Sequence, residues 1–413
     1  MPATGPSNTV TPRAAEIPPL VYADRAGARR LRICVVGDSA DLAPALAKDG
    51  HEVTLHRPGK GAAEAASWGL YRRLAGERPF DVVHAVDRAQ ALYHALMARR
   101  TLGELAATTF VAAVDQGPLR AAARDGAAVS VDDLVAEHLE RRAIECADYA
   151  LVRAGAEARW LAWRGVRLPP QAYLQPAPGD WDAWAAWYRG VPLPQRAPRP
   201  GAAPSVDPAP EMMATAEGSL AEAVAQGSTP FVLLLAAGVA PRPGAFGKLL
   251  QGIAQSGADG CVCLAELNRP GGERLPALGG AVAALAAGCA LAAPALVVRR
   301  AALREISAAL PAKTHLAEGD LNAIQVALTL AGFQVDTLPA ALFVQPHRPA
   351  AALPPACLDA VPALLHGLVW RAASSPALEQ DNERLRAELG DLRRSTSWRL
   401  TAPLRWLKTL FRS

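Results

Sequence analysis

Three polar side chains stand where predicted strands end. His84, Asp87 and Asp115 lie at or just after the carboxyl ends of two apolar runs, residues 80–84 and 108–114. Crevices that bind ligands in open α/β sheets form at such strand ends, so an imidazole and two carboxylates there could hydrogen-bond a polar ligand. The alternative for a lone histidine at a strand end is a purely structural role, and both interpretations stay open at this point.

The elements that would position these residues alternate along the first half of the chain. Strands are expected over residues 31–37, 51–56, 80–84, 108–114 and 149–152, with helices between them. The longest helix is expected over residues 131–146, with Ser130, Asp132 and Asp133 as capping candidates. This alternation predicts a doubly wound, Rossmann-like parallel sheet over residues 29–189. The turn Gly37-Asp38-Ser39 after the first strand is not a complete dinucleotide-binding fingerprint.

A proline-rich segment follows this predicted domain. Seven prolines in residues 190–210 suit neither a helix nor a central strand, so a semi-rigid linker is expected. A second α/β domain is predicted over residues 211–350, beginning with a helix at 211–226 and a buried strand at 230–236. Residues 296–339 then follow the order strand, Arg-Arg, helix, acidic loop, helix, Gly-Phe, strand. The fold class is therefore α/β in both halves.

Three stretches carry a likeness to sugar transferases. FDVVHAVDRAQALYHALMARRTLG, TTFVAAVDQG and LERRAIECADYALVRAGAEARWL resemble the N-terminal domain of family-4 (GT-B fold) glycosyltransferases, over about residues 31–175. Residues 211–348 resemble a degenerate C-terminal half of family-2 (GT-A fold) glycosyltransferases. The string SWRLTAPLR near the C-terminus resembles the ending of bacterial glycosyltransferases that build O-antigen and other surface polysaccharides.

The family-2 resemblance implies a general base in the acidic loop. Counting back from Gly332-Phe333 places Asp320 on the first acid of the family's pair and Leu321 on the second, with Glu318 as a substitute if the loop shifts. Such a base would deprotonate the acceptor hydroxyl. The alternative is that Asp320 caps the following helix. Arg300, in the Arg-Arg pair, is a candidate phosphate contact, with a structural ion pair as the alternative.

The resemblance also marks where metal-binding carboxylates would stand. That position is occupied by Ala236-Ala237-Gly238, and neither Asp nor Glu occurs between Glu222 and Asp259. No metal site and no cofactor is therefore expected. In the first half, Trp181, Trp184 and Trp187 share one helix face, which indicates either a platform for glycan binding or packing against the sheet.

Composition narrows the class of protein. The net charge of +4 is too small to imply nucleic acid by itself. The six cysteines form no CxxC pair, which favours reduced and mostly buried thiols. Residues 1–28 lack a basic start followed by an apolar core and are expected to be a disordered lead-in. Residues 275–298 carry no charge, yet glycines and prolines interrupt them, so a buried loop and strand is favoured over a membrane span.

The C-terminal region is expected to form two helices. Residues 376–394 form a charged helix with leucines at heptad spacing, which indicates either a short dimeric coiled coil or a helix docked on its own domain. Residues 395–413 form a basic amphipathic segment typical of a helix at a membrane surface, with docking on the protein body as the alternative. The residues expected to contact the membrane are Trp398, Leu400, Leu404, Trp406, Leu407 and Phe411.

Together these features predict a glycosyltransferase-like protein of cell-envelope polysaccharide synthesis. Its expected ligands are a nucleotide sugar and a glycan or lipid-linked acceptor, and its expected place is cytoplasmic, peripheral at the inner face of the cytoplasmic membrane. The alternative is an inactive homologue that acts as a membrane-tethered partner of an active glycosyltransferase or as a glycan-binding subunit. A homodimer is a further expectation, and nucleic acid is not an expected partner.

Overall fold

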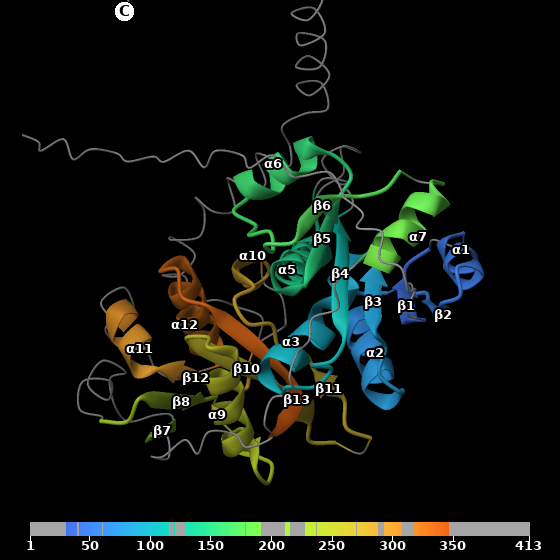
Figure 1. Ribbon diagram of the computed structural model, residues 1–413. Coiled ribbons are helices and arrows are strands. Elements are labelled where there is room, and N and C mark those ends of the chain that lie inside the picture. The colour runs from blue at the N-terminus through green and yellow to red at the C-terminus, as the bar shows by residue number, and fades with distance from the viewer. Residues whose placement is uncertain are drawn as a thin grey trace, which may run out of the picture.

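The computed structural model describes most of residues 30–346. The described ranges are 30–38, 41–59, 61–114, 117, 119, 129–177, 179–190, 211–214, 228–236, 238–269, 271–287, 293–307 and 318–346. Within them the chain folds into two adjoining α/β units, one built on a parallel sheet and one on a mixed sheet (Figure 1).

The first unit contains a parallel sheet, called sheet A below. In the described part of this unit its six strands lie in the order β2-β1-β3-β4-β5-β6. Their bounds are β1 Arg32–Val36, β2 Glu52–His56, β3 Val82–Ala85, β4 Thr109–Val114, β5 Tyr149–Val152 and β6 Ala172–Leu174. β3, β4 and β5 are buried along their whole length, because helices cover both faces of the sheet. The Rossmann-like parallel sheet expected from the alternating apolar runs is confirmed.

Two sets of helices cover sheet A. One face packs against α2 (Ala63–Gly76), α3 (Tyr93–Thr101), α5 (Val131–Cys146) and α6 (Gly155–Trp163), with the short 3-10 helix η1 (Ala89–Leu92) leading into α3. The other face packs against α1 (Leu42–Lys48) and α7 (Trp181–Gly190). The expected start of α5 is confirmed: Ser130 and Asp133 form a reciprocal capping box.

The second unit contains a mixed sheet, called sheet B below. Its described strands lie in the order β7-β8-β12-β10-β13-β9, with β11 paired to β10. Their bounds are β7 Glu211–Ala214, β8 Phe231–Leu235, β9 Ala240–Pro241, β10 Gly260–Leu267, β11 Arg274–Leu275, β12 Ala295–Arg299 and β13 Val335–Gln345. β12 runs antiparallel to both β8 and β10, while β13 runs parallel to β10. The carboxyl ends of β8, β10 and β13 therefore share one edge of sheet B.

Helices also cover both faces of sheet B. α11 (Arg300–Ile306) and α12 (Glu318–Leu330) pack on one face, and α9 (Ala245–Ser256) packs on the other. α12 ends at a tight turn whose Gly332 has a φ of 89°, a left-handed value that favours glycine, and the chain returns as β13. α12 thus runs back across the sheet, and its first turn lies toward the carboxyl edge of sheet B.

The two units contact each other directly. α3 of the first unit packs on β13 and α9 of the second, and α5 packs on the short helix α10 (Val282–Ala286), as Figure 1 shows around α3 and β13. Glu64 accepts two hydrogen bonds from Arg274, at 2.5 and 2.9 Å, across this boundary. The hydroxyl groups of Tyr93 and Thr337 lie 2.8 Å apart in its buried interior.

The expectations for five other segments have different outcomes. The helix predicted over residues 211–226 is wrong at its start, because residues 211–214 pair with β8 as strand β7. The described parts of residues 275–298 include the end of β11, α10 and most of β12, and no described helix is long and apolar enough to cross a bilayer. The helices predicted at 376–394 and 395–413, and the lead-in at 1–28, lie outside the described residues.

The cysteine prediction is confirmed where the structure describes these residues. Cys34, Cys261 and Cys263 are buried, Cys146 is half-buried, and all four are free thiols. Burial raises the pKa of the Cys34 thiol to about 12, so it stays protonated at neutral pH.

Candidate functional site

The turn after β1 lies at the carboxyl edge of sheet A. Gly37 adopts a φ of 130°, and a Cβ at this position would lie 2.1 Å from Asp87 Oδ1. Asp87 Oδ2 accepts the backbone N–H of Asp38 at 3.2 Å, and Arg88 pairs with Asp38 at 3.6 Å. The predicted ligand-binding residue Asp87 therefore holds the glycine turn in place. Asp115, predicted for the same edge, lies outside the described residues.

His84 lies inside the core of the first unit. Its side chain has no exposed surface, and its Nδ1 lies 2.5 Å from the hydroxyl of Tyr188. The rings of Trp184 and Trp187 are also in contact with the imidazole. Burial lowers the pKa of His84 to about 3, so the ring is neutral. In this arrangement a sugar cannot reach the ring, and the buried tryptophans of α7 pack against sheet A as the packing interpretation expected.

The residues predicted in the second unit lie at two separate edges of sheet B. Glu318 and Asp320 belong to the first turn of α12, toward the carboxyl edge. Asp320 is the third residue of α12, and its role as a base or as a helix cap stays a prediction. Arg300 follows the antiparallel strand β12 and therefore lies at the opposite edge. It is buried, and its guanidinium donates to the backbone carbonyl and the hydroxyl of Thr229, at 2.6 and 3.1 Å.

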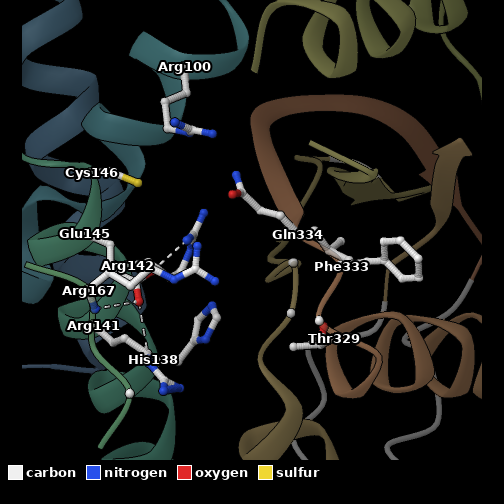
Figure 2. Close-up of a pocket in the computed structure, with 15 residues that line it drawn as sticks. Arg100, His138, Arg141, Arg142, Glu145, Cys146, Arg167, Thr329, Phe333 and Gln334 are labelled. Carbon is white, nitrogen blue, oxygen red and sulfur yellow. Dashed lines mark hydrogen bonds and ion pairs between the residues drawn. The ribbon is translucent and has the colours of Figure 1, made fainter. Parts of the chain in front are cut away.

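A cavity of about 340 Å³ lies between the two units. One wall consists of the ends of α3 and α5 and the loop after α6, and the other consists of the end of α12 and the start of β13, as Figure 2 shows. α3 and α5 lead into β4 and β5, so the cavity lies at the amino edge of sheet A, opposite the predicted crevice. Its charged lining residues are Arg100, Arg141, Arg142, Arg167 and Glu145.

A buried carboxylate beside this cavity connects the two units. Asp336, at the start of β13, has no exposed surface. It accepts two hydrogen bonds of 3.1 Å from Arg100, one of 2.6 Å from Arg142, and two, of 3.0 and 3.1 Å, from Gln334. Arg142 also donates to Glu145 at 2.7 Å. Asp336 is thus fully hydrogen-bonded, and it neutralises arginines that come from the other unit.

The two remaining arginines of the cavity are less fully paired than Arg100 and Arg142. Arg141 donates to the Arg164 carbonyl at 2.9 Å, and its Nε lies 3.8 Å from Glu145. The side chain of Arg167 is exposed and has no hydrogen bond or ion pair within the described part of the chain. Because Arg100 and Arg142 already neutralise Asp336, a positive charge remains at the mouth of the cavity.

Neutral groups complete the lining. Burial, together with the nearby Arg142 and Arg141, lowers the pKa of His138 to about 3, so its ring adds no charge. Its Nε2 has no hydrogen-bond partner in the described structure. Burial also raises the pKa of the Cys146 thiol. The backbone at Gly279 lies close to the backbone of β13, because a Cβ at Gly279 would lie 2.7 Å from the carbonyl oxygen of Asp336.

Sequence reasoning missed this cavity. The sequence feature that could have indicated it is an Arg-Arg pair that occurs twice, near the ends of α3 and α5. Arg99 pairs with Asp148 of its own unit at 2.6 Å, whereas Arg100 reaches across to Asp336. The acidic partner is distant in sequence, so neither pair indicated a boundary between units.

The structure does not bring the predicted site residues together. Within the described ranges, no group of three or more His, Cys, Asp or Glu side chains could hold a metal ion. A comparison with protein-family models finds none that matches this chain, and a comparison with curated proteins finds no match either.

Proposed function

We propose that this chain is a glycosyltransferase-like protein of cell-envelope polysaccharide synthesis. It would transfer a sugar from a nucleotide donor to a glycan or lipid-linked acceptor at the inner face of the cytoplasmic membrane. The observation that supports this most is the pairing of a Rossmann-like parallel sheet with a second α/β unit, in the order that the sequence resemblance implies. Both units have a carboxyl edge, where open α/β sheets bind ligands.

The proposed chemistry belongs to the carboxyl edge of sheet B. Asp320 or Glu318, in the first turn of α12, would accept the proton of the acceptor hydroxyl as it attacks the sugar. At the carboxyl edge of sheet A, the turn held by Gly37 and Asp87 offers polar groups to a substrate.

Binding of nucleotide sugars tests the proposal. Isothermal titration calorimetry with a panel of uridine, guanosine and thymidine diphosphate sugars, with and without manganese, should reveal one donor. Asp320→Asn should keep donor binding and lower turnover by about 100-fold or more, as expected for loss of a general base. Asp41→Asn, on the exposed start of α1, is the matched control and should leave both unchanged. The proposal fails if no donor in the panel binds.

A second candidate is an inactive homologue that binds an active glycosyltransferase or a glycan. It is favoured by one feature: Ala236-Ala237-Gly238, at the end of β8, carries no carboxylate where the family resemblance implies a metal-binding pair. The same titrations separate the two candidates. Donor binding with turnover supports the enzyme, whereas binding of a glycan without any nucleotide sugar supports the inactive homologue.

A further inference from the structure

The cavity between the two units has more positive charge than its own acids neutralise. Four arginines line it, and among the described residues the acids in or beside it are Glu145 and the buried Asp336. Two other arginines in the described ranges each have an acidic partner of their own: Arg99 pairs with Asp148, and Arg164 pairs with Glu137. At the cavity, by contrast, the described arginines outnumber the described acids.

This excess charge belongs to Arg141 and Arg167. Both come from the first unit, Arg141 from α5 and Arg167 from the loop after α6, and both lie at the same wall of the cavity as Glu145 (Figure 2). Arg167 donates only its backbone N–H to Glu145, at 3.4 Å, so its guanidinium remains available. A guanidinium presents donors in a planar fork that matches a carboxylate or a phosphate group.

The shape of the cavity suits a small anion. Its volume of about 340 Å³ lies at the lower end of the range for small-molecule sites. Glycines at positions 165, 279, 280 and 332 line it without side chains. Phe333 and Thr329 lie across from the arginines. Nε2 of His138, a residue with 8% exposed surface, is a buried polar atom without a partner among the described residues.

We propose that this cavity is a binding site for the phosphate groups of a small molecule, a diphosphate above all, with Arg141 and Arg167 as its principal ligands. Arg100 and Arg142 also line the cavity and add to its positive potential, while Asp336 fixes their positions. The site is separate from the proposed sugar-transfer edges, because it lies at the amino edge of sheet A and at the opposite end of α12 from Asp320. It does not rest on the proposed function.

Calorimetric titration of the full chain with inorganic pyrophosphate and with UDP tests the site. Both probes should bind the intact protein. The variant Arg141→Ala/Arg167→Ala should bind them more weakly, by roughly tenfold or more for each arginine removed. The charge-matched control is Arg57→Ala/Arg72→Ala, which removes two exposed arginines outside the cavity and should bind as the intact protein does. Tighter binding of UDP than of pyrophosphate assigns the diphosphate to a nucleotide, whereas equal binding assigns it to the diphosphate alone.

Three results would overturn the site: no binding of either probe, equal binding by the cavity variant and the intact protein, or an equal loss in the control variant. Circular dichroism of each variant shows whether it is folded. Arg141→Lys/Arg167→Lys retains the charge but lacks the planar fork, so it should bind with intermediate affinity. Failure of every nucleotide sugar to bind, with arginine-dependent pyrophosphate binding intact, would remove the proposed transferase function and leave this site standing.

Discussion

Replacing Asp336 by asparagine removes the one negative charge that joins two arginines of the first unit to β13 of the second. The carboxylate is fully buried, and it accepts charged hydrogen bonds of 3.1 Å from Arg100 and 2.6 Å from Arg142. The asparagine side chain has nearly the same size, so the change is one of charge and hydrogen bonding and leaves no large void. Arg100 would lose its ion pair with Asp336. Arg142 would also lose its ion pair with Asp336 but would keep the one with Glu145.

The magnitude follows from these contacts. One ion pair at about 3 Å is worth roughly 5 kcal/mol of Coulomb attraction at an effective dielectric constant of about 20. Removing one partner of a buried pair generally costs about 3–5 kcal/mol, because the other charge stays behind unpaired. The Arg100 side chain is 29% exposed and water can solvate it, so we expect the lower value, about 3 kcal/mol.

Urea unfolding followed by tryptophan fluorescence measures this loss. Asp336→Asn should lower the unfolding free energy by about 3 kcal/mol, whereas the exposed control Asp41→Asn should change it by less than about 0.5 kcal/mol. Combining Asp336→Asn with Arg100→Gln in a double-mutant cycle should give a coupling energy of about 1 kcal/mol or more. A loss below about 1 kcal/mol, or additive effects in the cycle, would refute the claim that this carboxylate holds the two units together.

Four further predictions use the same stability assay or a binding assay. Burial lowers the pKa of His84, His94 and His138 to about 3, so between pH 6.5 and pH 3 these imidazoles take up protons only in the unfolded state. The free energy of unfolding should therefore fall by about 4 kcal/mol in total between pH 7 and pH 5.5. A fall under about 1 kcal/mol would contradict the claim that all three histidines are neutral in the folded protein. Glu64→Gln removes the negative charge and one of the two oxygens that accept from Arg274, so it should cost about 3 kcal/mol. Ser130→Ala should cost about 1 kcal/mol through loss of the capping box of α5, and no measurable loss would exclude the cap as a stabilising feature. Deletion of residues 395–413 should abolish sedimentation with anionic vesicles, and unchanged sedimentation would remove the proposed membrane role of the tail.

Local sequence pattern predicted the elements of the fold because burial and backbone geometry are local properties. The apolar runs at 31–37, 80–84 and 108–114 became central strands, and the Ser130 signal became the start of α5. Residues 211–214 show the limit of this reasoning: a segment with helix-forming residues pairs with β8, and that pairing overrides its intrinsic preference.

The site was less predictable because it depends on contacts between distant segments. Strand order places Asp87 at a carboxyl edge, as the alternating pattern indicated, but the burial of His84 required the position of α7, which follows it by about a hundred residues. Arg100 and Asp336 are 236 residues apart. No periodicity or motif in one sequence connects such a pair, since each residue taken alone is an ordinary charged side chain at the end of an element.

The position of Asp336 also links the proposed anion site to the docking of the two units. Arg100 and Arg142 bind Asp336 and line the cavity, so the cavity exists only while the units are docked. A ligand that binds only this docked form stabilises it by about 2.7 kcal/mol at a concentration 100-fold above its dissociation constant. Pyrophosphate should therefore raise the unfolding midpoint of the intact protein and recover part of the stability lost in Asp336→Asn. It should not do so in Arg141→Ala/Arg167→Ala, and equal recovery there would mean that the anion acts elsewhere on the protein.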